Sequence, residues 1–153
     1  MKFLFLFLAT MSLLAQKKMK PEMTELWEPV PELVNPGNLS TPPSDAIILF
    51  DGTDLSQWIN ATNGEPAHWI VNSDGSMTVK QKGGIETKEE FGSIQLHIEW
   101  KTPIVVNGNG QGRGNSGVYF QKSYEIQVLD SYNNVTYSNG QAASVYKQSV
   151  PLV

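Results

Sequence analysis

Apolar and polar side chains alternate along residues 117–129, and this pattern constrains the fold more than any other feature of the sequence. Successive side chains of a β-strand point to opposite faces, so the alternation predicts one strand with a core face and a polar face. The predicted core face carries Val118, Phe120, Tyr124, Ile126 and Val128. The predicted polar face carries phenol, amide, hydroxyl and carboxylate groups typical of a sugar-binding cleft, from Tyr119, Gln121, Ser123, Glu125 and Gln127.

The chain from residue 45 onward reads as short strands separated by turns. Further strands are predicted at 46–50, 69–71, 76–80, 85–87 and 93–101. An Asp-Gly turn joins the second and third of these, which predicts a β-hairpin. A glycine-rich loop precedes the alternating strand, and no segments of helical period separate the strands. This organisation predicts an all-β sandwich.

The N-terminal residues have the pattern of a secretory signal peptide. Lys2 precedes an apolar run over residues 3–14. That run is shorter than the ~20 residues that a membrane span needs. We therefore expect a signal peptide at 1–15, cleaved after Ala15, and a periplasmic or secreted protein without a membrane span.

Residues 16–44 hold six of the nine prolines, and proline blocks helix interiors and central strands. This segment is expected to be a Pro-rich leader. The β-sandwich domain is expected at 45–153, where the chain ends without a closing strand. The sequence therefore predicts a domain that is incomplete at its C-terminus.

Composition excludes several kinds of partner and site. The net charge of −4 provides no basic footprint, so a nucleic acid partner is not expected. The chain has no cysteine and two histidines without zinc-ligand spacing, which argues against a zinc-type motif. A hard divalent cation held by oxygen ligands stays open, and the cofactor is otherwise unknown.

Candidate catalytic residues come first from two predicted strands. The polar face of 93–101 carries His97 and Glu99. If that strand shares a sheet with 117–129, both side chains lie on one surface with Tyr119, Glu125 and Gln127. Side chains at i and i+2 lie ~6.6 Å apart along a strand, so Glu125 and Gln127 can address one small ligand.

Three further polar residues flank the alternating strand. Asp130 falls on the opposite face from Glu125 unless a β-bulge near Leu129 restores its position. Arg113 is either a loop charge or a contact to a substrate oxygen. Asn115 either caps the turn before the strand or binds substrate.

The chain resembles the 3-keto-disaccharide hydrolase domain family. The resemblance lies in the order of the segments 49–58, 69–71 with 74–75, 99–100, 115–118, 125–130 and 136–146. It implies a concanavalin-like jelly-roll sandwich and an exported bacterial enzyme that cleaves glycosides whose sugar is oxidised at C3. Family domains normally continue beyond the last residue of this chain, which agrees with the expected truncation.

The carboxylate spacing implies an unusual glycosidase. Glu125-x-Gln127-x-x-Asp130 is similar to the Glu-x-Asp-x-x-Glu strand of laminarinase-type enzymes, with two acids replaced. A retaining mechanism needs two carboxyl groups ~5–5.5 Å apart, which Glu125 and Asp130 could supply only with the bulge. Ordinary double displacement is therefore disfavoured.

A 3-keto sugar offers an elimination route instead. Its carbonyl acidifies the C2 proton, so removal of that proton lets the glycosidic oxygen leave from C1, and water addition completes hydrolysis. The expected base is Glu125 or His97, and the expected acid is Glu99 or Asp130. Arg113 or a bound cation would stabilise the enolate oxygen.

Two other functions fit the same residues. A non-catalytic glycan-binding module would use the polar face and exposed tryptophans for binding alone. An adhesion or scaffold domain would have Glu125 and Gln127 covered by another chain. Acids with perturbed pKa in a deep cleft favour the enzyme, whereas a flat aromatic face favours the module.

Overall fold

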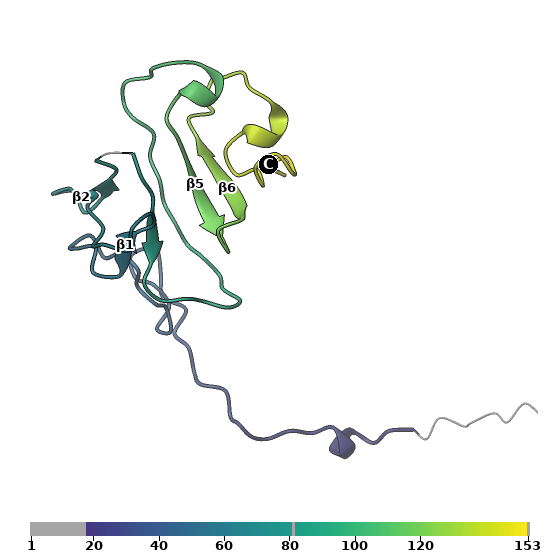
Figure 1. Cartoon of the computed structure of the whole chain (residues 1–153). Coiled ribbons are helices and arrows are strands. Elements are labelled where there is room, and N and C mark those ends of the chain that lie inside the picture. The colour runs from purple at the N-terminus through teal and green to yellow at the C-terminus, as the bar shows by residue number, and fades with distance from the viewer. Residues whose placement is uncertain (1–17, 81, 153) are drawn as a thin grey trace, which may run out of the picture. The chain divides into compact units, whose positions relative to one another are not determined.

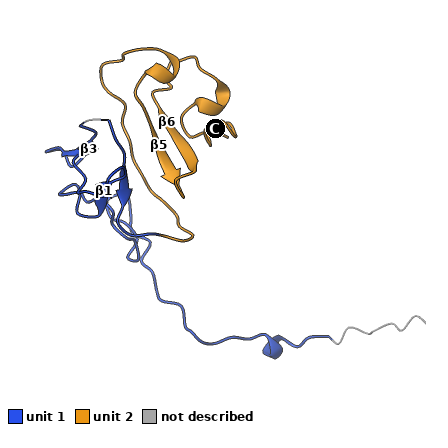
Figure 2. Cartoon of the chain, in the orientation of Figure 1, with its two compact units in different colours: residues 1–90 blue, residues 91–153 orange. Residues whose placement is uncertain are grey.

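The computed structural model describes residues 18–80 and 82–152, so the expected signal peptide at 1–15 lies outside the described residues. The chain divides into two compact units, Met1–Glu90 and Phe91–Val153 (Figure 2). Regular structure in the described parts consists of six short strands and three 3-10 helices. The expected all-β class is confirmed.

The first unit contains two small antiparallel sheets. Strand β1 (Trp58–Asn60) pairs with β4 (Ile85–Thr87), and β2 (Ile70–Val71) pairs with β3 (Met77–Thr78). The β2–β3 pair confirms the predicted hairpin. Gly75 in its turn has a φ of +77°, a conformation that glycine adopts without a steric penalty.

The predicted strand at 46–50 is wrong, because this segment has no ladder partner among the described residues. The chain instead enters a turn at Asp51, whose Oδ1 accepts hydrogen bonds from the Thr53 amide (2.9 Å) and hydroxyl (2.6 Å). These bonds hold the pKa of Asp51 below its usual value. The Leu49 carbonyl accepts a 2.6 Å hydrogen bond from the Trp58 indole, which ties the segment to β1.

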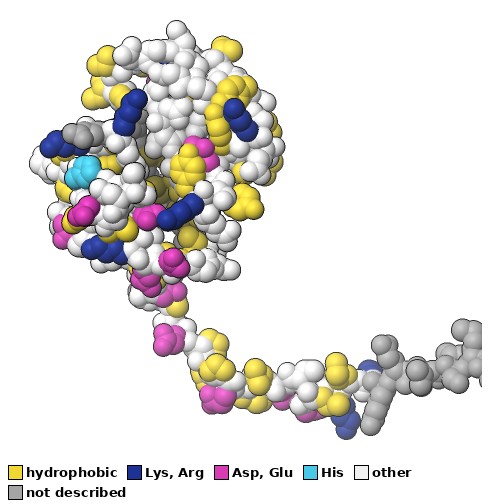
Figure 3. Space-filling model, in the orientation of Figure 1, with side chains coloured by type: hydrophobic (Ala, Val, Ile, Leu, Met, Phe, Trp, Pro, Cys, Tyr) yellow, Lys and Arg dark blue, Asp and Glu magenta, His cyan; other side chains and the backbone are white. Residues whose placement is uncertain are grey.

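The described part of the expected leader, 18–44, carries the short 3-10 helix η1 (Pro21–Met23). Its large apolar side chains, including Trp27 and Leu33, are exposed. Figure 3 shows hydrophobic and acidic side chains at the surface of this segment. Among the described residues, no helix has the length and apolar character needed to cross a membrane.

The second unit is built on one hairpin of β5 (Asn115–Phe120) and β6 (Tyr124–Leu129), which lie side by side in Figure 1. The predicted single strand at 117–129 is therefore wrong. Gln121 and Lys122 have φ values of 51° and 56°, and Ser123 N donates to the Phe120 carbonyl at 3.0 Å. This left-handed pair forms the tight turn that reverses the chain.

The predicted strand at 93–101 is also wrong. No ladder hydrogen bonds join this segment to another described strand. Its apolar side chains at Ile94, Leu96, Ile98 and Trp100 are exposed. Alternation alone does not make a strand, because a strand needs a partner for its backbone groups.

Burial in the hairpin follows the prediction in part: Tyr119, Gln121 and Ser123 of the predicted polar face are exposed, but the far end of that face is not. Gln127, on the predicted polar face, is 2% exposed, and Leu129, two residues further along the same side of the strand, is 0% exposed. On the predicted core face, Val118 and Ile126 are half-buried and Tyr124 is exposed. Loop residues bond to Gln127, which explains why this end of the face is buried. The unit is held mainly by buried polar groups.

Candidate functional site

Glu125 is the best-positioned acid of the predicted set. It is half-buried on β6, where Tyr119 of β5 is its cross-strand partner. Its side chain reaches diagonally across to Gly117, where a methyl group would lie 2.7 Å from Glu125 Cγ and 2.8 Å from Cδ. Only glycine at position 117 leaves room for this carboxylate on the sheet.

Tyr119 stands beside this carboxylate and is mostly exposed. Partial burial and the hydrogen bond between its phenol and Glu125 raise the pKa of Tyr119 above its usual value. The phenol therefore stays protonated near neutral pH and donates to the carboxylate. A polar sugar atom can meet a donor and an acceptor at this point.

A segment after β6 returns along its outer edge. Tyr146 N donates to the Glu125 carbonyl at 2.9 Å, and Val145 forms a bridge with Ile126. This pairing places the backbone of Tyr146 beside Glu125. No alternating pattern marks the segment of Tyr146, so the sequence does not single this residue out.

Tyr146 forms a pair with Tyr137. Their hydroxyl oxygens are 2.5 Å apart, and their ring centroids are 6.1 Å apart at an interplanar angle of 52°. The shared hydrogen bond is the main cause that raises the pKa of Tyr137 to about 12, and the charge on Glu125 adds to it. Both phenols thus belong to the surroundings of Glu125.

The ammonium group of Lys147 lies over the rings of Tyr137 and Tyr146. Its Nζ lies 5.7 Å from the Tyr137 centroid and 5.5 Å from the Tyr146 centroid, within cation–π range. Its backbone is left-handed, with a φ of 56°, and its N–H donates to the Asn139 carbonyl at 2.8 Å. Two tyrosines within 137–146 are the feature of the sequence that marks this cluster. The segment is separate from the alternating residues 117–129, so the sequence does not show that it lies near Glu125.

The predicted substrate ligands Gln127 and Asn115 are bonded to the protein itself. Gln127 Nε2 donates to Gln111 Oε1 at 2.8 Å and to the Gly140 carbonyl at 3.4 Å. Asn115 Nδ2 donates to the Gln111 carbonyl at 2.9 Å. Gln111 belongs to the 3-10 helix η2 (Gly110–Gly112), so this network fixes the glycine-rich loop against the sheet.

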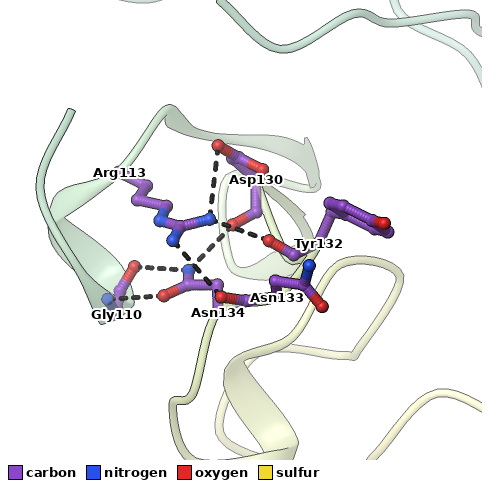
Figure 4. A network of polar contacts seen from close by, with 6 residues as sticks. All are labelled: Gly110, Arg113, Asp130, Tyr132, Asn133 and Asn134. Carbon is purple, nitrogen blue, oxygen red and sulfur yellow. Dashed lines mark hydrogen bonds and ion pairs between the residues drawn. The ribbon is translucent and has the colours of Figure 1, made fainter. Parts of the chain in front are cut away.

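Arg113 and Asp130 form a second cluster, drawn in Figure 4. Arg113 Nη1 lies 3.8 Å from Asp130 Oδ2, and both side chains are largely buried. The strand register runs unbroken from the pair Phe120–Tyr124 to the pair Asn115–Leu129. The expected bulge near Leu129 is therefore wrong, and Asp130 stays on the opposite face from Glu125.

The remaining contacts of this cluster are also internal. Arg113 donates to the carbonyls of Tyr132 (2.8 Å) and Asn133 (3.3 Å). Asn134 Nδ2 donates to the Asp130 carbonyl at 2.8 Å, and Asn134 Oδ1 accepts from Gly110 N at 2.7 Å. These bonds join the glycine-rich loop to the turn after β6.

His97 and Glu99 lie in the extended segment that precedes the loop. His97 Nε2 and Glu99 Oε1 are 3.4 Å apart, and the side chains are 87% and 88% exposed. An ion pair this exposed contributes little to stability. His97 and Glu99 are thus close to each other, as predicted for one strand face. In the described residues, however, they share no sheet with Glu125.

The described residues contain no group of three or more histidine, cysteine, aspartate or glutamate side chains arranged to hold a metal ion. The chemistry that the described side chains can perform is proton transfer by Glu125 together with hydrogen-bond donation by Tyr119, Tyr137 and Tyr146. A general base and phenolic donors of this kind suit a substrate rich in oxygen.

Comparisons with known proteins agree with this description. Residues 45–152 match the family of 3-keto-alpha-glucoside-1,2-lyase-like domains. No curated protein matches the chain. A proposed glycosyl hydrolase from Parabacteroides distasonis ATCC 8503, whose crystal structure was determined at 2.13 Å, is 52% identical and superimposes with a TM-score of 0.77. The match covers 88% of this chain and 59% of the length of that structure.

Proposed function

The chain belongs to the 3-keto-alpha-glucoside-1,2-lyase-like domain family, and from this premise we propose that it cleaves 3-keto-glycosides by acid–base elimination followed by hydration. The family match, which extends over residues 45–152, is the observation that carries the proposal. The similarity to a proposed glycosyl hydrolase supports the broader assignment to glycoside cleavage.

The elimination breaks two bonds on neighbouring carbons. A base takes the C2 proton, and the electron pair of that bond forms an enolate with the C3 carbonyl. The enolate then expels the glycosidic oxygen from C1, leaving a C1–C2 double bond, and the leaving oxygen takes a proton from an acid. Expulsion re-forms the C3 ketone, and addition of water across the double bond, with the hydroxyl to C1 and the proton to C2, completes the hydrolysis.

Glu125 is the proposed base. It is a half-buried carboxylate on a rigid hairpin, with its position set by Gly117 and with Tyr119 as its neighbour. Placement on a strand instead of a mobile loop suits a group that must meet one particular C–H bond. Single general-base groups contribute about 10²–10⁴-fold to rate, so loss of Glu125 should leave a folded protein of very low activity.

The other predicted residues keep more limited roles. His97 is the alternative base and Glu99 is the proposed acid, both on an exposed segment. Arg113 and Asp130 are assigned to holding the glycine-rich loop, because their contacts are internal. Gln127 and Asn115 support the sheet beneath the substrate.

The proposal includes the larger fold and the location of the protein. The hairpins are proposed to be parts of a concanavalin-like jelly roll, and residues 45–153 to belong to that domain. The protein is proposed to be exported by a signal peptide at 1–15. Intact-mass measurement of the protein from the culture fluid or periplasm tests this, because cleavage after Ala15 predicts a mature chain that begins at Gln16.

A direct assay tests the activity. The full chain is incubated with methyl 3-keto-α-glucoside and, separately, with methyl α-glucoside, and the products are identified by mass spectrometry. We expect methanol release from the ketone and not from the parent glucoside. Glu125→Gln should abolish turnover, whereas Glu90→Gln, an exposed carboxylate of the first unit, should not. A chelator arm decides whether a divalent cation takes part.

One observation favours a second function, a non-catalytic glycan-binding module. Tyr119 and Tyr137 are exposed, so the aromatic surface around Glu125 is open. Phenol rings of this kind bind sugars by contact as well as by hydrogen bonds. Binding of the keto sugar without any turnover would support the module over the enzyme.

A further inference from the structure

Tyr137 and Tyr146 have two hydroxyl protons, and only one of them is needed for the hydrogen bond between them. Two hydroxyl groups 2.5 Å apart share one hydrogen bond, so one of the two protons lies between the oxygens and the other points outward. We propose that this pair is the hydrogen-bond donor to the C3 oxygen of the bound sugar, where the enolate charge develops. The inference rests on the proposed function and assigns residues to a step that Glu125 alone cannot perform.

The location of the pair fits that step. The carbon that loses its proton to Glu125 is bonded to the carbon that carries the carbonyl oxygen. A donor for the enolate oxygen must therefore lie beside the carboxylate. Tyr146 is held there by its backbone hydrogen bond to Glu125, and Tyr137 is close enough for the Glu125 charge to act on it.

The shared hydrogen bond and the charge on Glu125 keep Tyr137 protonated. The hydrogen bond that Tyr137 shares with Tyr146 raises the pKa of Tyr137 to about 12, and the negative charge on Glu125 acts in the same direction. Lys147 lies over both rings, and Tyr119 lies on the other side of Glu125. Tyr137 is thus a donor across the neutral range and not a competing base.

The absence of a side chain at Gly140 lets the backbone hold the Tyr137 ring in place. A methyl group at Gly140, which is buried, would lie 2.6 Å from Tyr137 Cδ2 and 2.8 Å from Cζ. Glycine there lets the Tyr137 ring pack against the backbone of the 3-10 helix η3 (Ser138–Gly140). Lys147 adopts a left-handed backbone, which is unfavourable for lysine.

The test removes one hydroxyl at a time from the full chain. Tyr137→Phe and Tyr146→Phe keep the rings, and Tyr132→Phe, at a phenol that is 82% exposed, is the matched control. With methyl 3-keto-α-glucoside as substrate, loss of an oxyanion donor should lower kcat/KM about 10²-fold in the first two variants only. Equal kcat/KM in all three variants and the wild type overturns the inference while leaving the proposed function intact.

A second readout does not depend on turnover. The absorbance of phenolate is followed as pH is raised, and Tyr146→Phe should move one titration from about 12 toward the ordinary value of 10.0. An unchanged titration contradicts the shared hydrogen bond and overturns the inference. If the wild type binds the keto sugar but does not turn it over, the proposed activity fails. In that case weaker binding by Tyr137→Phe supports the donor role, and equal binding overturns it.

Discussion

The side chain of Glu125 lies across the backbone of Gly117, so closely that a methyl group at position 117 would sit 2.7 Å from Glu125 Cγ. The two residues are diagonal neighbours on antiparallel strands, since Gly117 pairs with Gln127 and Glu125 with Tyr119. Because Gly117 has no side chain, the carboxylate of Glu125 can lie over its backbone.

Gly117→Ala should displace the carboxylate without breaking the hairpin. A misplacement of about 1 Å costs on the order of 10²-fold in rate, so kcat/KM on methyl 3-keto-α-glucoside should fall by about that factor. Gly92→Ala is the matched control, because a methyl group there meets no atom within 4 Å. Full activity in Gly117→Ala would show that the position of Glu125 does not matter for the reaction.

Gln121→Asn combined with Lys122→Gly should stabilise the hairpin. Both positions have left-handed φ values, and Asn-Gly is the preferred pair for such a turn. Relief of left-handed strain is worth roughly 1–2 kcal/mol per non-glycine residue, so the free energy of unfolding should rise by about 1 kcal/mol or more. Urea denaturation measures it, and a decrease would contradict the assigned turn.

The turn at Gln121 and Lys122 shows which features of the hairpin could be predicted from the sequence. Every cross-strand pair from Asn115–Leu129 to Phe120–Tyr124 joins two odd or two even positions, so the alternation passes through the turn unbroken. The sequence therefore predicted which residues share a face, but not the reversal, because Gln121-Lys122 carries none of the usual turn residues. The β2–β3 hairpin was predicted because Asp74-Gly75 does.

The candidate site shows the same limit. Glu125 and Tyr119 were predicted together because strand periodicity is local in sequence. Tyr137 and Tyr146 reach Glu125 only through a returning segment, and such a long-range approach leaves no periodic signal. His97 and Glu99 were predicted to lie on one surface with Glu125 because residues 93–101 alternate, but this segment has no partner strand among the described residues.

Stability should depend on the Tyr137 phenol at alkaline pH. Because its pKa in the folded chain is about 12 and its ordinary value is 10.0, the folded state holds this proton more tightly. The associated stability is fully present below pH 10 and is lost as pH rises through about 12. Urea titrations at pH 9 and pH 11 should show a smaller loss in Tyr137→Phe than in the wild type. An equal loss in both proteins would mean that the phenol is not coupled to folding.

Arg113→Gln should destabilise the protein. The Arg113–Asp130 pair is largely buried at 3.8 Å, and removal of the guanidinium leaves Asp130 without its cation. Breaking a buried pair costs about 3 kcal/mol, measurable as a lower free energy of unfolding. Lys101→Gln, at an exposed cation, should have almost no effect. Similar stabilities of the two variants would argue that Arg113 is free for another role.

The central claim is that Glu125 removes the C2 proton of a 3-keto sugar. The most direct measurement is the kinetic isotope effect on kcat/KM for methyl 3-keto-α-glucoside deuterated at C2, in the wild type and in Glu125→Gln. Proton removal by Glu125 predicts a primary isotope effect in the wild type and a loss of turnover of about 10²–10⁴-fold in Glu125→Gln. Glu125→Gln with full activity, or wild-type turnover with no isotope effect and no exchange of the C2 proton with solvent, would contradict it.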